Sequence, residues 1–192
     1  MTKQNQENSL RIAKEIFYRG KHKDALEYAL SLARSGDVNS CVFVGWLLSK
    51  GGKGVKQDQE QAIKWLELAS NSGSVDAKYI LGTVYCDLRK YDQAISSFKQ
   101  ASASGYSAAF YQLGKMYYFG IGLARDLSQA YCYFCEASKL GHIFGRRSKA
   151  LMLIKGYKGR KNILLGIILL IWSVLVGIWV ALIDPYNEKT FD

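Results

Sequence analysis

Small and aromatic residues recur in a fixed order from residue 25 to residue 141. An Ala is followed after three or four residues by an aromatic residue, after seven by Ala or Leu, and after eleven by Gly. The copies start 37, 32 and 36 residues apart, a period typical of solenoids built from helix hairpins. They are Ala25, Tyr28, Leu32 and Gly36; Ala62, Trp65, Ala69 and Gly73; Ala94, Phe98, Ala101 and Gly105; and Ala130, Tyr133 or Phe134, Ala137 and Gly141.

A second landmark precedes three of these copies, where Gly follows an aliphatic residue at Val44-Gly45, Leu81-Gly82 and Leu113-Gly114. A Gly inside a helix costs about 1 kcal/mol relative to Ala unless close packing compensates. We therefore predict that each copy is the second helix of a hairpin, and that the first helix uses its Gly to approach it closely. In the clearest copy the turn lies at Gly120–Gly122, and the second helix runs from near Asp126 to Gly141.

The units at 40–73 and 109–141 resemble the Sel-one-like repeats (SLR) of the tetratricopeptide repeat (TPR) superfamily, and the second matches their pattern best. The matching residues are Ala109, Leu113, Gly114, Tyr117, Gly120, Gly122, Leu123 (for Val), Asp126 and Ala130. The unit at 40–73 departs from this pattern at Ser40 and Leu48 and has a longer turn, the unit at 75–105 is closer to a plain TPR, and the unit at 6–36 is the weakest match. The resemblance implies an all-α, right-handed helix-hairpin solenoid of about four units over residues 6–141, after a disordered segment at 1–5.

Residues 163–183, ILLGIILLIWSVLVGIWVALI, carry no charge. As a helix they would be roughly 30 Å long, enough to cross the hydrocarbon core of a bilayer. A buried core helix is the other interpretation, but a small solenoid has no interior that could surround a helix apolar on every side. We therefore expect a C-terminal transmembrane helix, inserted after translation as a tail anchor and followed by a short acidic tail at 184–192.

Much of the net charge of +10 lies just before this apolar segment. The segment 142–162 is expected to be a basic capping and juxtamembrane region. Its cations, which we expect to contact anionic lipid head groups, are Arg146, Arg147, Lys149, Lys155, Lys158, Arg160 and Lys161. Basic residues favour the cytoplasmic side, and residues 1–9 lack the apolar stretch of a signal peptide. The expected localisation is a single-pass protein, in the bacterial inner membrane, with cytoplasmic repeats and the C-terminus outside.

Small residues within the apolar segment fall on one side of a helix. They are Gly166, Ser173, Gly177 and Ala181. Helices associate in lipid through close backbone approach, which small residues permit. We expect this strip to pack against a partner's helix, most simply that of a polytopic membrane protein, although small residues are also common in spans for no such reason.

Chemistry-bearing residues do not converge on a catalytic or metal site in the sequence. Cys132 and Cys135 form a C-x-x-C pair inside a predicted helix, without a second pair, and the chain has only two histidines. The Gly-rich segment 50–56 lacks the Lys-Ser/Thr ending of a phosphate loop. We therefore expect no enzyme activity, no cofactor, no metal, no small-molecule substrate and no nucleic-acid partner.

The resemblance also implies a binding groove along the first helices of the hairpins. The groove positions map onto Lys14, Phe17, Val42, Trp46, Ser49, Tyr79, Thr83, Cys86, Tyr111, Lys115 and Tyr118. Aromatic and cationic side chains suit a protein segment bearing apolar and acidic groups; the other interpretation is that they are partly buried packing residues.

The function implied is that of a membrane-anchored, non-enzymatic adaptor or scaffold that assembles a membrane complex, with bacterial envelope or exopolysaccharide synthesis and export as the fold-level analogy. The alternative is a regulatory or stabilising subunit of an integral-membrane enzyme, such as a polysaccharide synthase, that acts mainly through its transmembrane helix.

Overall fold

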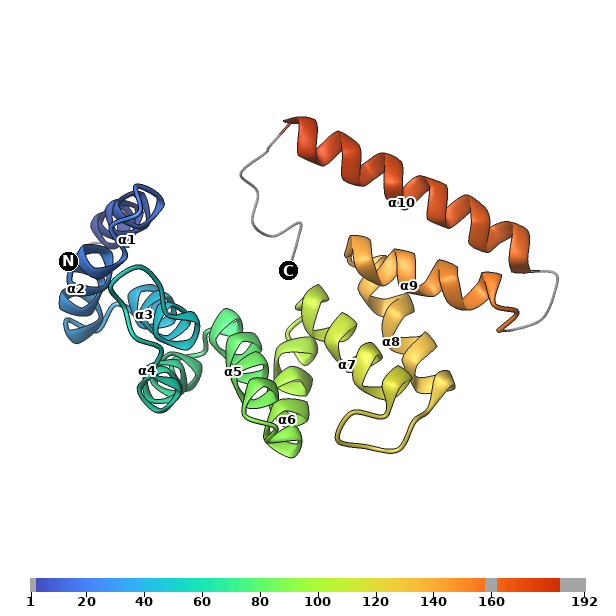
Figure 1. Cartoon of the computed structure of the whole chain (residues 1–192), viewed down its shortest axis with the longest axis horizontal. Coiled ribbons are helices and arrows are strands. Elements are labelled where there is room, and N and C mark those ends of the chain that lie inside the picture. Colours follow the sequence, from blue (N-terminus) through green and yellow to red (C-terminus); the bar gives the residue numbers. More distant parts are fainter. Residues whose placement is uncertain (1–2, 158–161, 184–192) are drawn as a thin grey trace. The chain divides into compact units, whose positions relative to one another are not determined.

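The structure, a computed structural model, describes residues 3–157 and 162–183. These residues form ten helices (Figure 1), and an isolated β-bridge joins Gly52 and Val55. The helices are α1 (Lys3–Tyr18), α2 (His22–Arg34), α3 (Val38–Lys50), α4 (Gln59–Asn71), α5 (Val75–Asp87), α6 (Tyr91–Ala103), α7 (Ser107–Phe119), α8 (Leu127–Lys139), α9 (Ile143–Ile154) and α10 (Ile163–Ile183).

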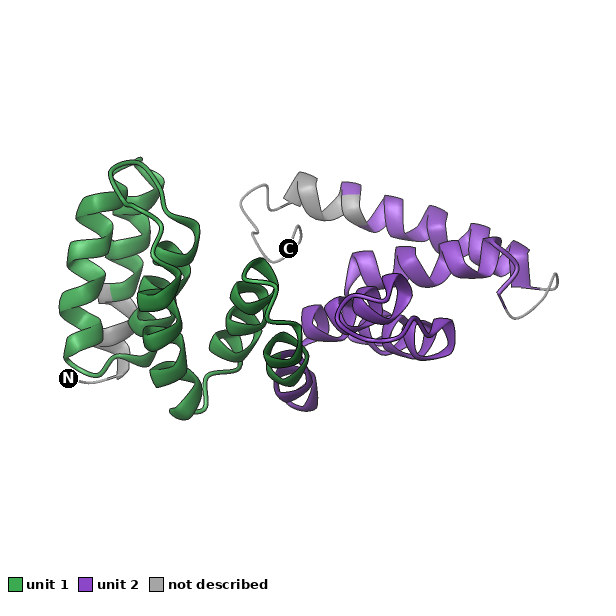
Figure 2. Ribbon diagram, turned by 60° about the horizontal axis from the view of Figure 1, so that its bottom comes forward, with its two compact units in different colours: residues 1–97 green, residues 98–192 purple. Residues whose placement is uncertain are grey.

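The chain divides into two compact units, residues 1–97 and 98–192 (Figure 2). The first unit contains α1 to α5 and the start of α6, and the second contains the rest of α6 and α7 to α10. Each unit has its own buried apolar cluster. Leu47 and Leu66 lie at the centre of the first, and Phe134 and Met152 lie in one of the second.

Short polar side chains fix where four of the described helices begin. Asp37 accepts a hydrogen bond from the backbone N–H of Ser40 at the start of α3, over 2.8 Å. Asp58, Ser74 and Asp126 cap α4, α5 and α8 in the same way. Each of these side chains satisfies a backbone donor that the helix itself leaves unpaired. The Gly that closes each sequence copy precedes the next first helix with φ between +80° and +91°, a conformation that other residues rarely adopt.

Gly45 inside α3 and Gly114 inside α7 each allow a close helix contact, as the sequence predicts. A Cβ atom on Gly45 would lie 2.5 Å from Cγ of Leu66 in α4, and one on Gly114 would lie 2.6 Å from the ring of Phe134 in α8. Real Cβ atoms do not approach other heavy atoms this closely. The glycines are therefore required by the packing of α3 on α4 and of α7 on α8.

The repeat register continues one hairpin further than the sequence copies indicate. The first helices follow N-cap residues Asp37, Ser74, Tyr106 and His142, and the residue eight positions after each N-cap is Gly45, Gly82, Gly114 and Ala150. Thus α9 begins as a first helix does, with Nδ1 of His142 accepting from the N–H of Gly145 over 3.0 Å. The segment 142–162 is therefore more than a cap, because α9 and α10 together form a fifth hairpin.

The all-α solenoid is confirmed, and one boundary differs from the sequence prediction. Helix α1 begins at Lys3, so residues 3–5 are helical where disorder was expected. The right-handed twist stays a prediction.

The apolar segment forms α10 with the expected bounds. Of the residues described, none belongs to a helix both long and apolar enough to cross a membrane. The transmembrane helix stays a prediction, and the acidic tail 184–192 lies outside the described residues.

The close contact of α7 and α8 generates a stability prediction. Gly114→Val should lower the free energy of unfolding by about 2 kcal/mol, since extra methyl groups overpack a filled site. The measurement is urea denaturation followed by circular dichroism. In a Phe134→Leu background the same change should cost clearly less, because the ring that the new side chain would meet is gone. Equal losses in both backgrounds would contradict the contact as the cause.

Candidate functional site

The predicted groove residues of the first unit differ in accessibility. Lys14 is exposed, and Phe17, Val42, Trp46, Thr83 and Cys86 are half-buried. Ser49 and Tyr79 are buried, so these two are packing residues and cannot contact a partner. The accessible members lie on α1, α3 and α5.

Four rings form a cluster at the junction of α1, α2 and α3, which we call the α1–α3 aromatic cluster: Phe17, His22, Phe43 and Trp46. Phe17 is its centre, with its ring 4.3 Å from His22 in a stacked pair and 5.4 Å from Trp46 edge to face. Phe43 stacks on Trp46 at 6.0 Å and is itself buried. Edge-to-face and offset pairs of this kind hold the rings in defined orientations. The cluster therefore presents Phe17 and Trp46 as rigid, partly accessible apolar side chains.

His22 and Phe43 were not among the predicted site residues. Nδ1 of His22 accepts a hydrogen bond of 3.0 Å from the backbone N–H of Lys53, which joins α2 to the turn after α3. A Cβ on Gly52 would lie 2.2 Å from that nitrogen, so the turn can approach the imidazole only because Gly52 has no side chain. The long Gly-rich turn was visible in the sequence, but its hydrogen bond to a histidine 31 positions upstream was not.

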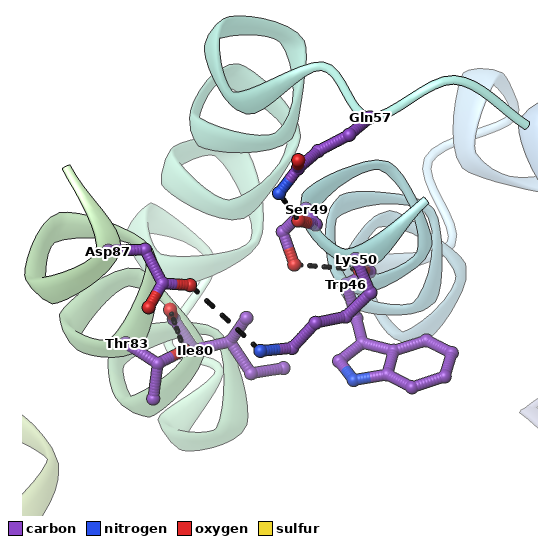
Figure 3. A network of polar contacts seen from close by, with 7 residues as sticks. All are labelled: Trp46, Ser49, Lys50, Gln57, Ile80, Thr83 and Asp87. Carbon is purple, nitrogen blue, oxygen red and sulfur yellow. Dashed lines mark hydrogen bonds and ion pairs between the residues drawn. The ribbon is translucent and has the colours of Figure 1, made fainter. Parts of the chain in front are cut away.

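Polar contacts fix the backbone beside Trp46 (Figure 3). The Ser49 hydroxyl donates to the carbonyl of Trp46 over 2.7 Å, and Nε2 of Gln57 donates to the carbonyl of Ser49 over 2.7 Å. Lys50 extends from α3 to Asp87 of α5 at 4.0 Å. Figure 3 shows the Trp46 indole on the side of α3 opposite Gln57, outside this network. The end of α3 is thus held in place while the indole stays partly accessible.

An open hollow lies along α1, and it includes one predicted groove residue. It is lined by Arg11, Lys14, Glu15, Tyr18 and Arg19. Glu15 pairs with Arg19 at 2.6 Å, and both side chains are largely exposed. The hollow therefore has an excess of positive charge beside an exposed Tyr.

The predicted groove residues of the second unit are largely covered by the chain itself. Tyr111 stacks on His142 with ring centres 4.8 Å apart, and also lies 6.0 Å from Phe144 of α9. Burial raises the pKa of the Tyr111 hydroxyl. The ammonium of Lys115 lies 5.5 Å above the Tyr111 ring, so both residues form part of the same packed group.

Tyr118 also contacts the chain itself, at the C-terminal end of α9 and at the turn between α7 and α8. Nζ of Lys155 donates to its hydroxyl over 3.2 Å, and the guanidinium of Arg125 lies 5.8 Å from the ring centre. In this unit the alternative interpretation of the groove, partly buried packing, describes Tyr111 and Tyr118 better than a free binding surface does.

The basic segment splits into residues of different accessibility. Arg147 and Lys155 are exposed, and Arg146 and Lys149 are half-buried. Nη1 of Arg146 is buried without a hydrogen-bond partner among the described atoms. Lys158, Arg160 and Lys161 lie outside the described residues. Contact of these cations with lipid head groups stays a prediction.

Two residues of the small-residue strip are covered by the chain itself. Gly166 and Ser173 are buried, and a Cβ on Gly166 would lie 2.8 Å from the carbonyl oxygen of Ala150 in α9. The side chains at Gly177 and Ala181 lie outside the described part. In this arrangement α9 packs against Gly166, and contact of the whole strip with a partner's helix stays a prediction.

Of the four cysteines, Cys41 is buried like a packing residue, and the other three are partly or fully exposed. Cys41 is buried, and burial, followed by the nearby Asp37, raises the pKa of its thiol, which disfavours the reactive thiolate. Cys132 is exposed and Cys135 half-buried on α8. Over residues 3–157 and 162–183, no three side chains of His, Cys, Asp or Glu are placed to hold a metal ion.

Comparison with known proteins agrees with this geometry. The Sel1 repeat family model matches residues 38–74 and 107–142, the hairpins α3–α4 and α7–α8. HRD3, a component of the ERAD-associated E3 ubiquitin-protein ligase of Candida glabrata, is 29% identical over 69 residues, which cover 36% of this chain and 8% of that protein. The chain thus spans a small part of this relative.

Solved structures share the fold over most of the chain. A Sel1 repeat protein from Oxalobacter formigenes has a TM-score of 0.72 at 19% identity, covering 96% of this chain and 84% of that one. A protective antigen of uropathogenic Escherichia coli with an SLR fold has a TM-score of 0.68 at 25% identity, covering 81% of this chain and 35% of that one. Sel1 repeat proteins are protein-interaction scaffolds. The family model thus matches Sel1 repeats in two of the hairpins, residues 38–74 and 107–142, and the solved structures show that the chain shares the fold of Sel1 repeat proteins.

Proposed function

We propose that this chain is a non-enzymatic scaffold that binds a protein partner through the α1–α3 aromatic cluster and is attached to a membrane by α10. The observation that carries the proposal is the Phe17–Trp46 pair, which is held edge to face and is accessible in part. Tryptophan anchors in well-packed surroundings account for much of the binding energy in protein interfaces. The fixed backbone around Ser49 limits the entropy that binding would cost.

The chemistry of the cluster and of the α1 hollow suggests what the partner segment carries. Phe17 and Trp46 would take an aliphatic or aromatic side chain, and Arg11 and Lys14 of the hollow would attract carboxylates. Both features involve α1, so one segment could contact them together. The proposed partner is therefore a protein segment with apolar and acidic side chains.

Membrane attachment rests on the composition of α10 and its neighbours. The helix has no charged residue, and seven basic residues and no acidic residue lie between positions 142 and 162. This asymmetry supports cytoplasmic repeats and a C-terminus on the other side, in a bacterial inner membrane, with anionic head groups near the cations. A polytopic membrane protein would be a suitable partner for a scaffold held there.

The alternative assignment, a regulatory or stabilising subunit of a membrane enzyme, predicts that α10 and not the aromatic cluster carries the partner interaction. A role in bacterial envelope or exopolysaccharide synthesis and export is a hypothesis compatible with either assignment. The first test below separates the assignments, because only the scaffold assignment predicts that Trp46→Ala weakens partner binding. The second test checks the membrane attachment that both assignments share.

For the cluster, Trp46→Ala should weaken binding of a partner recovered with the parent chain by about 2 kcal/mol or more, roughly 30-fold in Kd. Binding is measured by titrating the purified partner, with thermal melting measured in parallel. Phe43→Ala is the matched control, since it removes a buried ring of the same cluster and should act mainly on melting. Unchanged partner affinity in Trp46→Ala would remove the cluster as the binding site.

For the membrane, the full chain should float with vesicles of phosphatidylethanolamine and phosphatidylglycerol. Ile171→Glu, in an exposed position of α10, should abolish flotation, since a carboxylate is costly in hydrocarbon. Ser128→Glu on α8 adds the same charge at an exposed site of the solenoid and should float as the parent does. If the parent chain stays at the bottom of the gradient, membrane attachment is wrong.

A further inference from the structure

In the structure α10 packs on α9, in the place that the second helix of a hairpin takes. Helix α10 follows α9 as the second helix of each earlier hairpin follows its first, and the two run antiparallel side by side (Figure 1). The contact includes Ala150, the residue eight positions after the N-cap of α9. The Cβ that Gly166 lacks would meet the carbonyl oxygen of Ala150 at 2.8 Å, Cγ1 of Ile154 at 2.9 Å and the backbone nitrogen of Ile154 at 3.0 Å.

The opposite side of α10 is apolar and uncovered. Its exposed side chains are Leu164, Leu165, Ile167, Ile168, Ile171, Trp172, Val174, Leu175 and Ile178. At 100° per residue these positions cover about half of the helix circumference, and the buried Gly166 and Ser173 lie in the other half. Water is a poor solvent for so large a contiguous apolar face, which fits a bilayer as its second environment.

Docking on α9 and crossing a bilayer are not compatible. Gly166 lies level with Ala150 and Ile154, so at about 1.5 Å per residue Arg147 lies level with a position near residue 171 of α10. That position is close to the middle of the 21-residue helix. If α10 crossed a bilayer while docked, Arg146, Arg147 and Lys149 would be drawn toward the centre of the hydrocarbon, where charged side chains are disfavoured.

We propose that α10 occupies two mutually exclusive places, the face of α9 in the lipid-free chain and the bilayer in the membrane-bound chain. The solenoid thus carries its own docking site for an apolar helix with a small residue at the contact, and α10 is the occupant before insertion. Insertion vacates the face of α9 around Ala150 and Ile154. This inference rests on the proposed membrane attachment and adds the state of the α9–α10 hairpin to it.

Competition between the two places predicts the direction of a kinetic effect. Ile154→Ala removes a side chain that contacts α10 and leaves the apolarity of α10 unchanged. Because weaker docking shifts the chain toward the undocked form, Ile154→Ala should associate with vesicles severalfold faster than the parent. Leu151→Ala, at a more exposed position of α9 that does not border Gly166, should associate at the parent's rate.

The distance between the helices tests the inference directly in the full chain. Spin labels are placed at Arg147→Cys and Ile171→Cys, both exposed positions, in a variant whose Cys41, Cys86, Cys132 and Cys135 are Ala. Packed helices have axes about 8–10 Å apart, so the lipid-free chain should show a short label-to-label distance. In phosphatidylethanolamine–phosphatidylglycerol vesicles most of that short-distance population should be lost. A control pair at Gln129→Cys on α8 and Arg147→Cys should be unchanged.

Other results would overturn the inference in distinguishable ways. A chain that floats with the vesicles and keeps the short distance is bound with the hairpin closed, which refutes mutual exclusion and leaves membrane attachment standing. A lipid-free chain without the short distance refutes docking, as would equal association rates of Ile154→Ala and the parent. A chain that does not float refutes the membrane attachment itself, and the inference falls with it.

Discussion

Close approach between the two helices of a hairpin is the interaction on which the rest of this structure depends. It requires a very small side chain at one position of the register, eight residues after the N-cap of α3, α5, α7 and α9. Gly45 and Gly114 show the reason, since a Cβ at either would overlap Leu66 or Phe134. Each large side chain of a second helix packs against the backbone of its first helix. Neighbouring hairpins can then stack with their apolar faces buried, which a solenoid needs because no single hairpin can bury its own.

The same constraint decides which aromatic residues are available to a partner. In the second unit α9 packs on α7 through His142 and Phe144, and this covers Tyr111. In the first unit Trp46 lies at the end of the Phe17 and Phe43 stack and stays partly accessible. Equivalent positions of a repeat can therefore be packing in one unit and surface in another, because their exposure depends on the neighbouring helix and not on the repeat pattern.

Under the proposed membrane attachment, helix α10 meets two requirements that ordinarily belong to different helices. Its small residue Gly166 packs against the backbone of α9, and its exposed side is apolar. Its lack of charge serves both, because a helix without charged residues can be buried against protein or in lipid. The charges of α9 would prevent α10 from being docked and inserted at the same time, since Arg146, Arg147 and Lys149 would then enter the hydrocarbon at a high cost in free energy.

The sequence by itself determined the elements and the register. Periodic Ala, aromatic and Gly residues are local signals, as is an uncharged run of 21 residues, so the hairpins α3–α4 and α7–α8 and the bounds of α10 could be predicted. Only the tertiary structure decided which sides are covered. The burial of Ser49 and Tyr79, the contact of His22 with the Gly-rich turn and the docking of Gly166 on Ala150 all join residues distant in the chain. No periodicity encodes such pairings, because a side chain's exposure is set by whatever packs against it, and that is a property of the folded chain.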